Sequence, residues 1–231
     1  PASALVMSDV LYTVSTWALP VVLAVTLHEA AHGWVAWKLG DHTAYHRGRV
    51  SFNPLRHVDP FGTVILPLLL FLSSAPFLFG YARPVPVNFR ALRKPRRDME
   101  LVALAGPGIN IALALLSAIL LRALLAFGGD GASWLIANLS NAMIINVVLA
   151  VFNMLPIPPL DGGRVAVGLL PRVLARPFAR LERYGLFILV GLLLLLPWLG
   201  SKLGQDVNVM AWLVWKPVML VLTAIGMVTG L

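Results

Sequence analysis

Residues 10–40 have the sequence VLYTVSTWALPVVLAVTLHEAAHGWVAWKLG, an apolar stretch with His, Glu and His close together near its end. A helix needs about 20 apolar residues to cross the ~30 Å hydrocarbon core of a bilayer. Val10–Leu27 meets that need, and the pattern continues without a breaker through His28–Leu39 to Gly40, which suits a helix end. The stretch therefore predicts a membrane-spanning helix.

The whole composition agrees with a bilayer as the solvent. Of 231 residues, 59% are hydrophobic and 12% are charged, and the mean hydropathy is +0.84. A soluble domain carries about 25% charged residues, so a soluble monomer is excluded. The chain contains no cysteine, which excludes disulfides, thiolate metal sites and cysteine nucleophiles.

Further apolar stretches predict further membrane helices. A short turn at Gly129–Gly131 separates Leu101–Phe127 from Trp134–Leu155, so we expect these two stretches to form an antiparallel helix hairpin. The last two form a second pair around a short loop. The four stretches are Leu101–Phe127, Trp134–Leu155, Tyr184–Leu199 and Val207–Leu231.

One more apolar stretch, Phe61–Phe79, is interrupted by prolines. The segments beside it, Lys38–His57 and Arg83–Asp98, are both basic, and Asp161–Arg183 is a third basic segment. Lys and Arg gather in cytoplasmic loops. All three segments face the cytoplasm only if Phe61–Phe79 enters and leaves on one side as a re-entrant hairpin, and we favour that arrangement over a full crossing.

The net charge of +8 also raises the question of a nucleic-acid partner. The basic residues lie in alternate loops with few aromatic residues among them, and no continuous stripe for phosphates is evident. We therefore interpret the charge as an orientation signal, with the lipid bilayer as partner and no nucleic acid.

His28-Glu29-Ala30-Ala31-His32 is an H-E-x-x-H element on the first helix. Residues four apart share a helix face, so both imidazoles can reach one zinc ion while Glu29 serves as general base. The bare pattern is only moderately specific, and a helix end at the membrane interface is the alternative. Ionisable residues within a membrane helix are costly and usually functional, which favours the metal site.

A catalytic zinc ion normally has three protein ligands and one open position. Without cysteine, the third ligand must be His, Asp or Glu. His42, His46 and His57 are available in the basic loop after the helix, but Asp161 is the better candidate. The alternative role for Asp161 is to cap the following helix.

Asp161 ends the segment Asn153-Met-Leu-Pro-Ile-Pro-Pro-Leu-Asp161, which Gly162-Gly163-Arg164 follows. Its prolines cannot continue a helix, and unwound backbone at membrane depth is tolerated only where protein or water covers it. Gly162 and Gly163 give the chain room to pass close to another backbone segment.

Together these motifs resemble the site-2 protease family of intramembrane zinc metalloproteases, in the small form without a PDZ domain. The resemblance covers roughly residues 25–170. It implies that His28, His32 and Asp161 bind one Zn²⁺ per chain, that Glu29 is the catalytic base and that Asn153 lies near the substrate or oxyanion. Other segments that carry it are Gly40-Asp41, Gly48–Pro54, His57–Gly62, Pro84–Asn88 and Ala105–Asn110.

The family further implies hydrolysis of peptide bonds within or next to transmembrane segments, with Glu29 activating a zinc-bound water. We expect a single-pass transmembrane protein or a signal-peptide remnant as substrate. The expected location is the inner membrane of a bacterium, with the site toward the cytoplasm. A membrane metal transporter and an inactive membrane scaffold are the alternatives, and the intact set of four chemical residues argues against the scaffold.

A transmembrane substrate must unwind before hydrolysis, and a strand edge would satisfy its freed backbone groups. Gly48–Phe52 alternates polar and apolar residues and Pro84–Phe89 must be extended, so either segment is a candidate edge. We expect an all-α polytopic membrane protein with five to six transmembrane helices and a short β-hairpin or re-entrant segment at the cytoplasmic side of the core. One domain spans 1–231, with a catalytic core at about 10–170 and a C-terminal helix pair at 184–231.

Overall fold

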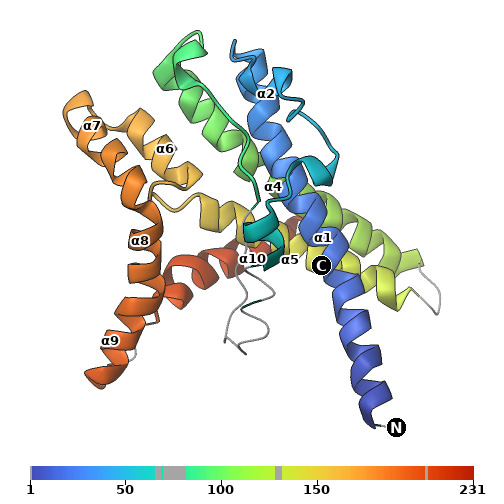
Figure 1. The fold of residues 1–231 in the computed structure, drawn as a ribbon. Helices are drawn as coiled ribbons and strands as arrows, with labels where there is room; N and C mark the ends of the chain where they lie inside the picture. Colours follow the sequence, from blue (N-terminus) through green and yellow to red (C-terminus); the bar gives the residue numbers. More distant parts are fainter. Residues whose placement is uncertain (1, 66–68, 70–81, 128–131, 206–207) are drawn as a thin grey trace.

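The computed structural model describes residues 2–65, 69, 82–127, 132–205 and 208–231 (Figure 1). Helices make up most of these ranges. They are α1 (Ala2–Lys38), α2 (Thr43–His46), α4 (Pro95–Phe127), α5 (Ser133–Asn153), α6 (Asp161–Leu169), α7 (Arg172–Arg180), α8 (Gly185–Val190), α9 (Leu196–Lys202) and α10 (Lys216–Thr229). Short 3-10 or π-helical turns are η1 (Pro54–Arg56), η2 (Pro60–Ile65), η3 (Phe89–Ala91), η4 (Leu181–Tyr184), η5 (Gly191–Leu195) and η6 (Ala211–Trp215).

Four helical segments of the described chain are long and apolar enough to cross a membrane, and a bent fifth segment can be added. The four are Ser8–Lys38, Pro95–Phe127, Ser133–Asn153 and Ala211–Thr229. The fifth joins Arg172–Tyr184 to Phe187–Lys202 through a bend of 77°, and it includes the span predicted at 184–199. The chain is thus an all-α, multi-pass membrane protein.

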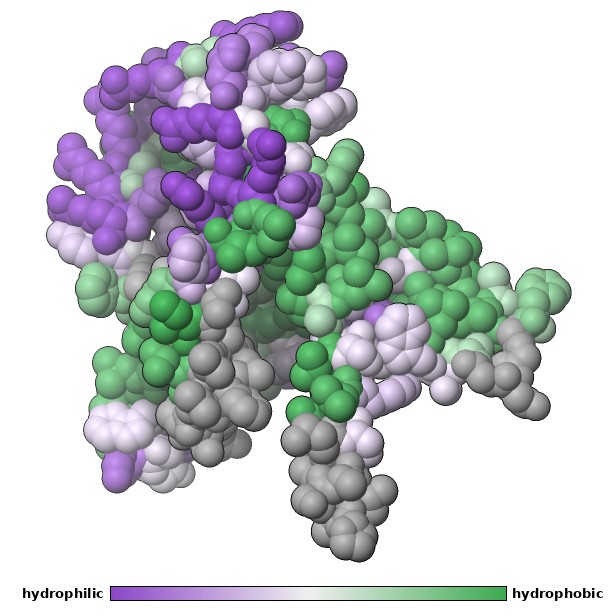
Figure 2. All heavy atoms as spheres, turned by 45° about the vertical axis from the view of Figure 1, so that its right-hand side comes forward, coloured by the Kyte–Doolittle hydropathy of each residue, from purple (hydrophilic) through white to green (hydrophobic). Residues whose placement is uncertain are grey.

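Polar and apolar side chains lie in different parts of the molecule. On the face shown in Figure 2, hydrophilic side chains gather at the upper end and hydrophobic side chains cover the surface below. Comparison with Figure 1 places α2, α6 and α7 at that upper end. Large apolar residues such as Leu116, Ile119 and Leu220 are more than half exposed. These side chains are suited to contact lipid rather than water.

The predicted hairpin of two antiparallel helices is confirmed: α4 and α5 pack along each other, and α1 packs against both (Figure 1). The predicted turn at 129–131 lies outside the described residues. Helix α4 begins at Pro95 rather than at Leu101, because Asp98 accepts a hydrogen bond from the Lys94 backbone N–H at 2.7 Å and so caps the first turn.

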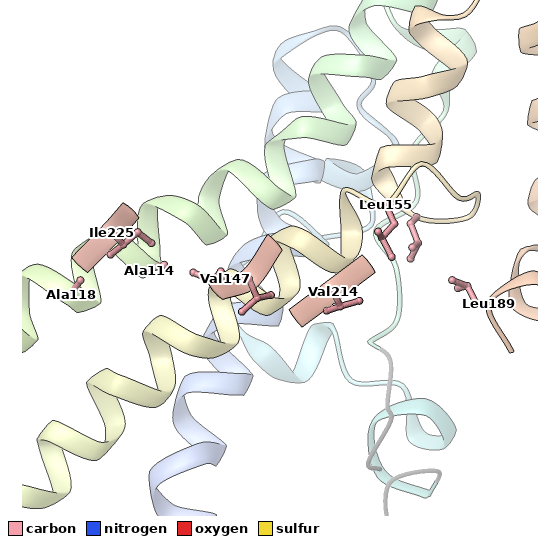
Figure 3. Close-up of a cluster of buried hydrophobic side chains, with 9 residues drawn as sticks. Ala114, Ala118, Val147, Leu155, Leu189, Val214 and Ile225 are labelled. Atoms are coloured by element: carbon pink, nitrogen blue, oxygen red, sulfur yellow. The ribbon is translucent and has the colours of Figure 1, made fainter. Parts of the chain in front are cut away.

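The C-terminal helix completes this core by packing on α4 and α5. Ala114 and Ala118 lie one turn apart on α4 and are fully buried. They share one buried cluster with Val147 of α5, Val214 of η6 and Ile225 of α10 (Figure 3). Small side chains at a helix interface let the backbones approach closely, as membrane helices require.

The expected β-hairpin is wrong for the described residues, since neither candidate segment forms a strand. Gly48 has a left-handed backbone (φ +61°), and Arg49 N–H bonds back to Ala44 O, so the first segment is a turn after α2. In the second, Pro84 and Pro86 have no N–H to donate to a ladder.

Carboxylates hold the second segment in place of a neighbouring strand. Val85 N–H donates to Glu29 Oε2 at 2.8 Å, and Asn88 N–H donates to Asp41 Oδ2 at 2.6 Å. Asp41 is fully buried after the end of α1. The extended backbone therefore lies along α1 from Glu29 toward Asp41.

The two flanks of the 61–79 stretch meet. Arg83 N–H donates to His57 O at 2.9 Å, and Arg49 Nη2 donates to Arg83 O at 2.6 Å. Arg49 Nη1 also donates to Arg56 O. The chain thus comes back to the point from which it left, although most of the stretch itself (66–68 and 70–79) lies outside the described residues.

Because the two flanks meet, we predict that the segments before and after the 61–79 stretch lie on the same side of the membrane. In the cysteine-free chain, Phe52→Cys and Arg97→Cys should react with a membrane-impermeant maleimide from the same side of sealed vesicles. Both residues are exposed and flank the joined ends. Phe127→Cys, at the far end of α4 and 91% exposed, should react from the other side. Labelling of positions 52 and 97 from opposite sides would contradict this arrangement.

Candidate metal centre

The three ligands predicted from the sequence converge at one point. His28 and His32 lie one turn apart on α1, with their Nε2 atoms 3.0 Å apart. Asp161 is the first residue of α6, and its Oδ2 lies 3.2 Å from each Nε2. All three side chains are buried. Among the described residues this is the one group of three His, Cys, Asp or Glu side chains able to share a metal ion.

Asp161 reaches the two histidines because the chain breaks between α5 and α6. Helix α5 ends at Asn153, and the proline-rich turn that follows leads directly into Asp161. A Cβ atom on Gly162 would collide with the Met154 backbone, and one on Gly163 with the Pro158 backbone. This confirms the predicted close backbone approach. The capping role is not observed, since Leu160 occupies the N-cap and no side chain caps α6.

The donor set fits a zinc ion. Asp161 Oδ2 is buried, and no hydrogen-bond donor is directed at it. Ligands bound tetrahedrally to zinc at about 2.0–2.1 Å lie roughly 3.3 Å apart, close to the observed 3.0 and 3.2 Å. Burial raises the pKa of the Asp161 carboxyl, but the two close imidazoles, when protonated, lower it by more, so the pKa lies well below its ordinary value. A zinc ion would take the place of those protons and favour the same carboxylate form.

Each imidazole is oriented through its other nitrogen. His28 Nδ1 lies 2.6 Å from Asn110 Oδ1, and His32 Nδ1 lies 2.7 Å from Val102 O. Both acceptors favour a proton on Nδ1, and in the neutral ring this leaves the Nε2 lone pair free to bind an ion at the centre. Asn110 is fully buried, and its Nδ2 donates to Asn146 Oδ1 at 2.7 Å. A chain of amides from α4 and α5 thus supports the ring on α1.

Gly106 of α4 leaves the space that the two rings occupy. A Cβ at this position would lie within 3.0 Å of ring atoms of both His28 and His32. Sequence reasoning quoted both Gly106 and Asn110 within a motif but gave neither a role. The sequence feature that could have indicated a role is Asn110 itself, because it is a polar residue inside an apolar membrane helix.

Glu29 lies beside this cluster on α1. Its Oε2 accepts the Val85 N–H, and the side chain is partly exposed. Its charge is near enough to interact with His32 and with the Arg49 guanidinium. The structure thus places the predicted base next to the predicted ligands, and it also holds one of its carboxylate oxygens.

Asn153 is not brought into the cluster by any described contact. It is the last residue of α5, and its Nδ2 donates to Leu149 O of the same helix at 3.0 Å. The alternative ligands also lie apart: His57 Nε2 is 2.9 Å from Ser51 O, and His42 Nδ1 is 3.1 Å from Gly40 O. His46 is exposed on α2.

Arg164 is a residue of the site that sequence reasoning missed. Its Nη1 lies 3.9 Å from Asp161 Oδ1, and its Nη2 lies 3.2 Å from Glu182 Oε1. The guanidinium therefore faces the Asp161 oxygen that is directed away from the two histidines. The sequence feature that could have indicated this contact is the position of Arg164 about one helical turn after Asp161.

Two glycines of α4 provide a matched test of the close approach. Gly106→Ala places a methyl group against both imidazoles, so zinc affinity should fall by about tenfold or more, as displaced ligand contacts usually cost. Gly108→Ala should keep wild-type affinity, because apart from its chain neighbours and the backbone of its own helix, no described atom lies within 4 Å of its Cβ position. Zinc competition titrations measure both variants. Equal affinity in the two would contradict the assigned role of Gly106.

A second pair of variants tests whether the Asn110 side-chain amide orients the His28 imidazole. Asn110→Leu leaves the His28 Nδ1–H without its acceptor, and zinc affinity should fall by about 10–100-fold. Asn138→Leu is the control, since Asn138 is also buried but donates within its own helix, to Trp134 O. The outcome that excludes a positioning role is unchanged zinc affinity in a folded Asn110→Leu protein.

Comparison with known proteins places the chain in a family. The model described as "Peptidase family M50" matches residues 129–196, which include Asp161. "Putative zinc metalloprotease YwhC" of Bacillus subtilis is 40% identical over 187 residues, covering 79% of this chain and 81% of that protein.

Two mycobacterial relatives share the name "Putative zinc metalloprotease Rip2". The Mycolicibacterium smegmatis protein is 31% identical over 75% of this chain and 64% of its own length. The Mycobacterium tuberculosis H37Rv protein is 35% identical over 61% and 52%, respectively. No solved structure matches at a significant level. Because the match to the Bacillus protein extends over most of both chains, this chain belongs to peptidase family M50, which confirms its resemblance to the site-2 proteases.

Proposed function

We propose that this chain is an intramembrane zinc endopeptidase in which His28, His32 and Asp161 bind one Zn²⁺ and Glu29 is the general base. The observation that carries the proposal is the convergence of three buried donor atoms from α1 and α6, 3.0–3.2 Å apart, beside a partly exposed carboxylate. The metalloprotease names of the relatives support the same chemistry.

His28, His32 and Asp161 would hold the zinc ion, which would supply Lewis-acid chemistry by making a water more acidic and polarising the scissile carbonyl. Glu29 takes the proton from the attacking water and passes it to the nitrogen of the leaving amine. Val85 N–H holds Glu29 Oε2, so Oε1 is the oxygen available for the proton. Arg164 faces Oδ1 of Asp161 and favours the anionic form of that ligand.

Asn153 is proposed to stabilise the oxyanion of the reaction. Its amide donates to Leu149 O at the end of α5, and a change of side-chain rotamer would free the N–H for a substrate oxygen. A donor of this kind contributes about 3 kcal/mol to transition-state stabilisation. Its place at the junction of α5 and the turn before Asp161 supports this role.

The substrate is proposed to be a single-pass transmembrane protein or a signal-peptide remnant, cleaved within or next to its membrane segment. His28 and His32 lie on a membrane-spanning helix near its polar end, which supports cleavage at the membrane. We further propose that the 61–79 stretch is re-entrant, that the basic end faces the cytoplasm and that the membrane is a bacterial inner membrane. The meeting of His57 and Arg83 supports the re-entrant path.

Cleavage of a model transmembrane substrate by the purified chain tests the proposal. Glu29→Gln should lower the cleavage rate by about 10²–10⁴-fold, the usual contribution of a general base, and should retain zinc. Asp161→Ala should lose both activity and stoichiometric zinc, because only two ligands remain. Elemental analysis accompanies the cleavage assay.

Three outcomes would contradict this account. Equal cleavage by wild type and Glu29→Gln would exclude the proposed mechanism. Full zinc occupancy in Asp161→Ala would move the third ligand to His42, His46 or His57. Metal flux into proteoliposomes, independent of Glu29, would instead favour a metal transporter.

A further inference from the structure

A second site lies away from the metal centre, at the other end of α6. A cavity of about 290 Å³ opens between η3, the first turns of α4, the end of α6 and α7. Its lining surface is mainly apolar, which we call the apolar floor, and four of the lining residues are arginines, which we call the arginine rim. The residues that matter here are Phe89, Val167, Arg90, Arg96, Arg172 and Arg176.

Positive charge predominates around this cavity, although the Glu100 carboxylate lies beside Gly168 at the end of α6. No acidic residue lines it. In the described parts of the chain, Arg90, Arg172 and Arg176 have no ion pair, in contrast to Arg164, which pairs with Glu182. Several like charges around one hollow repel each other, so an anionic ligand would be favoured there.

The fourth arginine is fixed in place. Arg96 Nε donates to Gly168 O at 2.6 Å, and its Nη2 donates to Leu170 O. These bonds tie the start of α4 to the end of α6 and set the distance between the two walls. The arginine rim is therefore attached to a defined framework rather than to a free loop.

Helix α7 is suited to lie at the membrane surface. Arg172, Arg176 and Arg180 follow one another at intervals of four residues and so share a face. On other faces Val173 is 83% exposed and Leu174 is 55% exposed. A helix with a basic face and exposed apolar residues lies in the membrane interface, with its arginines at headgroup level. The helix belongs to the hydrophilic end of the molecule (Figures 1 and 2).

We propose that this cavity binds the headgroup of an anionic glycerophospholipid. Arg90, Arg172 and Arg176 would contact the phosphate, because guanidinium groups bind phosphate oxygens in bidentate fashion. The apolar floor would contact the first methylenes of the acyl chains. A free phosphate ion has the same charge chemistry but makes no use of the apolar floor, and basic pockets beside membrane helices suit anionic lipid headgroups.

Binding of short-chain lipids to the purified full chain in neutral detergent tests the site. Dioctanoylphosphatidylglycerol is the probe, and native mass spectrometry counts the bound lipid. Dioctanoylphosphatidylcholine has the same chains without net charge, and glycerol 3-phosphate has the phosphate without chains. Both should bind at least about tenfold more weakly than the probe, because each lacks one of the two attractions.

Two double variants separate the cavity from general surface charge. Arg172→Gln with Arg176→Gln should weaken binding of the probe by about tenfold or more. Arg180→Gln with Arg183→Gln removes the same charge from the same stretch of chain but outside the cavity lining, and should change binding less than about twofold. All four residues are exposed, and circular dichroism checks that both proteins keep their helices.

Three results would overturn the proposal. Equal losses in the two double variants would show diffuse attraction to the basic end of the molecule. Binding of glycerol 3-phosphate as tight as that of the lipid would identify a site for free phosphate groups. Equal binding of the two dioctanoyl lipids would remove the role of charge. None of these readouts depends on peptidase activity or zinc.

Discussion

The rest of the structure depends on how one carboxylate is kept ionised among apolar helices. Asp161 is 5% exposed and lies 3.2 Å from the Nε2 atoms of His28 and His32. A buried charge is costly unless a cation or hydrogen bonds compensate for it. A divalent ion bound by the carboxylate and two neutral imidazoles would provide that compensation, so the same ion would serve both the stability and the proposed chemistry of the centre.

Helices α4, α5 and α6 leave room for Asp161 and the two imidazoles and support them. Gly106 lets α4 approach the imidazoles, and Gly162 lets α6 begin against the backbone of the preceding turn. The buried amides of Asn110 and Asn146 hold the ring of His28 from behind. Small residues and amides thus occupy buried positions in α4, α5 and α6, where a larger apolar residue would collide with its neighbours or remove a hydrogen bond that supports a ligand.

The sequence predicted the helices and the two histidines because their signals are local: apolar length and a four-residue spacing. The break before Asp161 made it the better candidate for the third ligand, and the resemblance to a known family implied the full set. The support of Asn110 and Gly106 depends on which face of α4 meets α1, and a single sequence does not specify this face. The β-hairpin was predicted from the alternation in Gly48–Phe52, the extended Pro84–Phe89 segment and the need of an unwound substrate for a strand edge. In the fold, carboxylates of Glu29 and Asp41 bind the backbone N–H groups of the proline-containing segment, which removes the need for a partner strand.

The identity of the metal ligands is the central claim, and X-ray absorption at the zinc K edge of the purified chain tests it most directly. The account predicts one zinc per chain with about four nitrogen or oxygen ligands at roughly 2.0–2.2 Å and the multiple scattering of two imidazoles. Scattering from three imidazoles would contradict it, because His42, His46 or His57 would then replace Asp161.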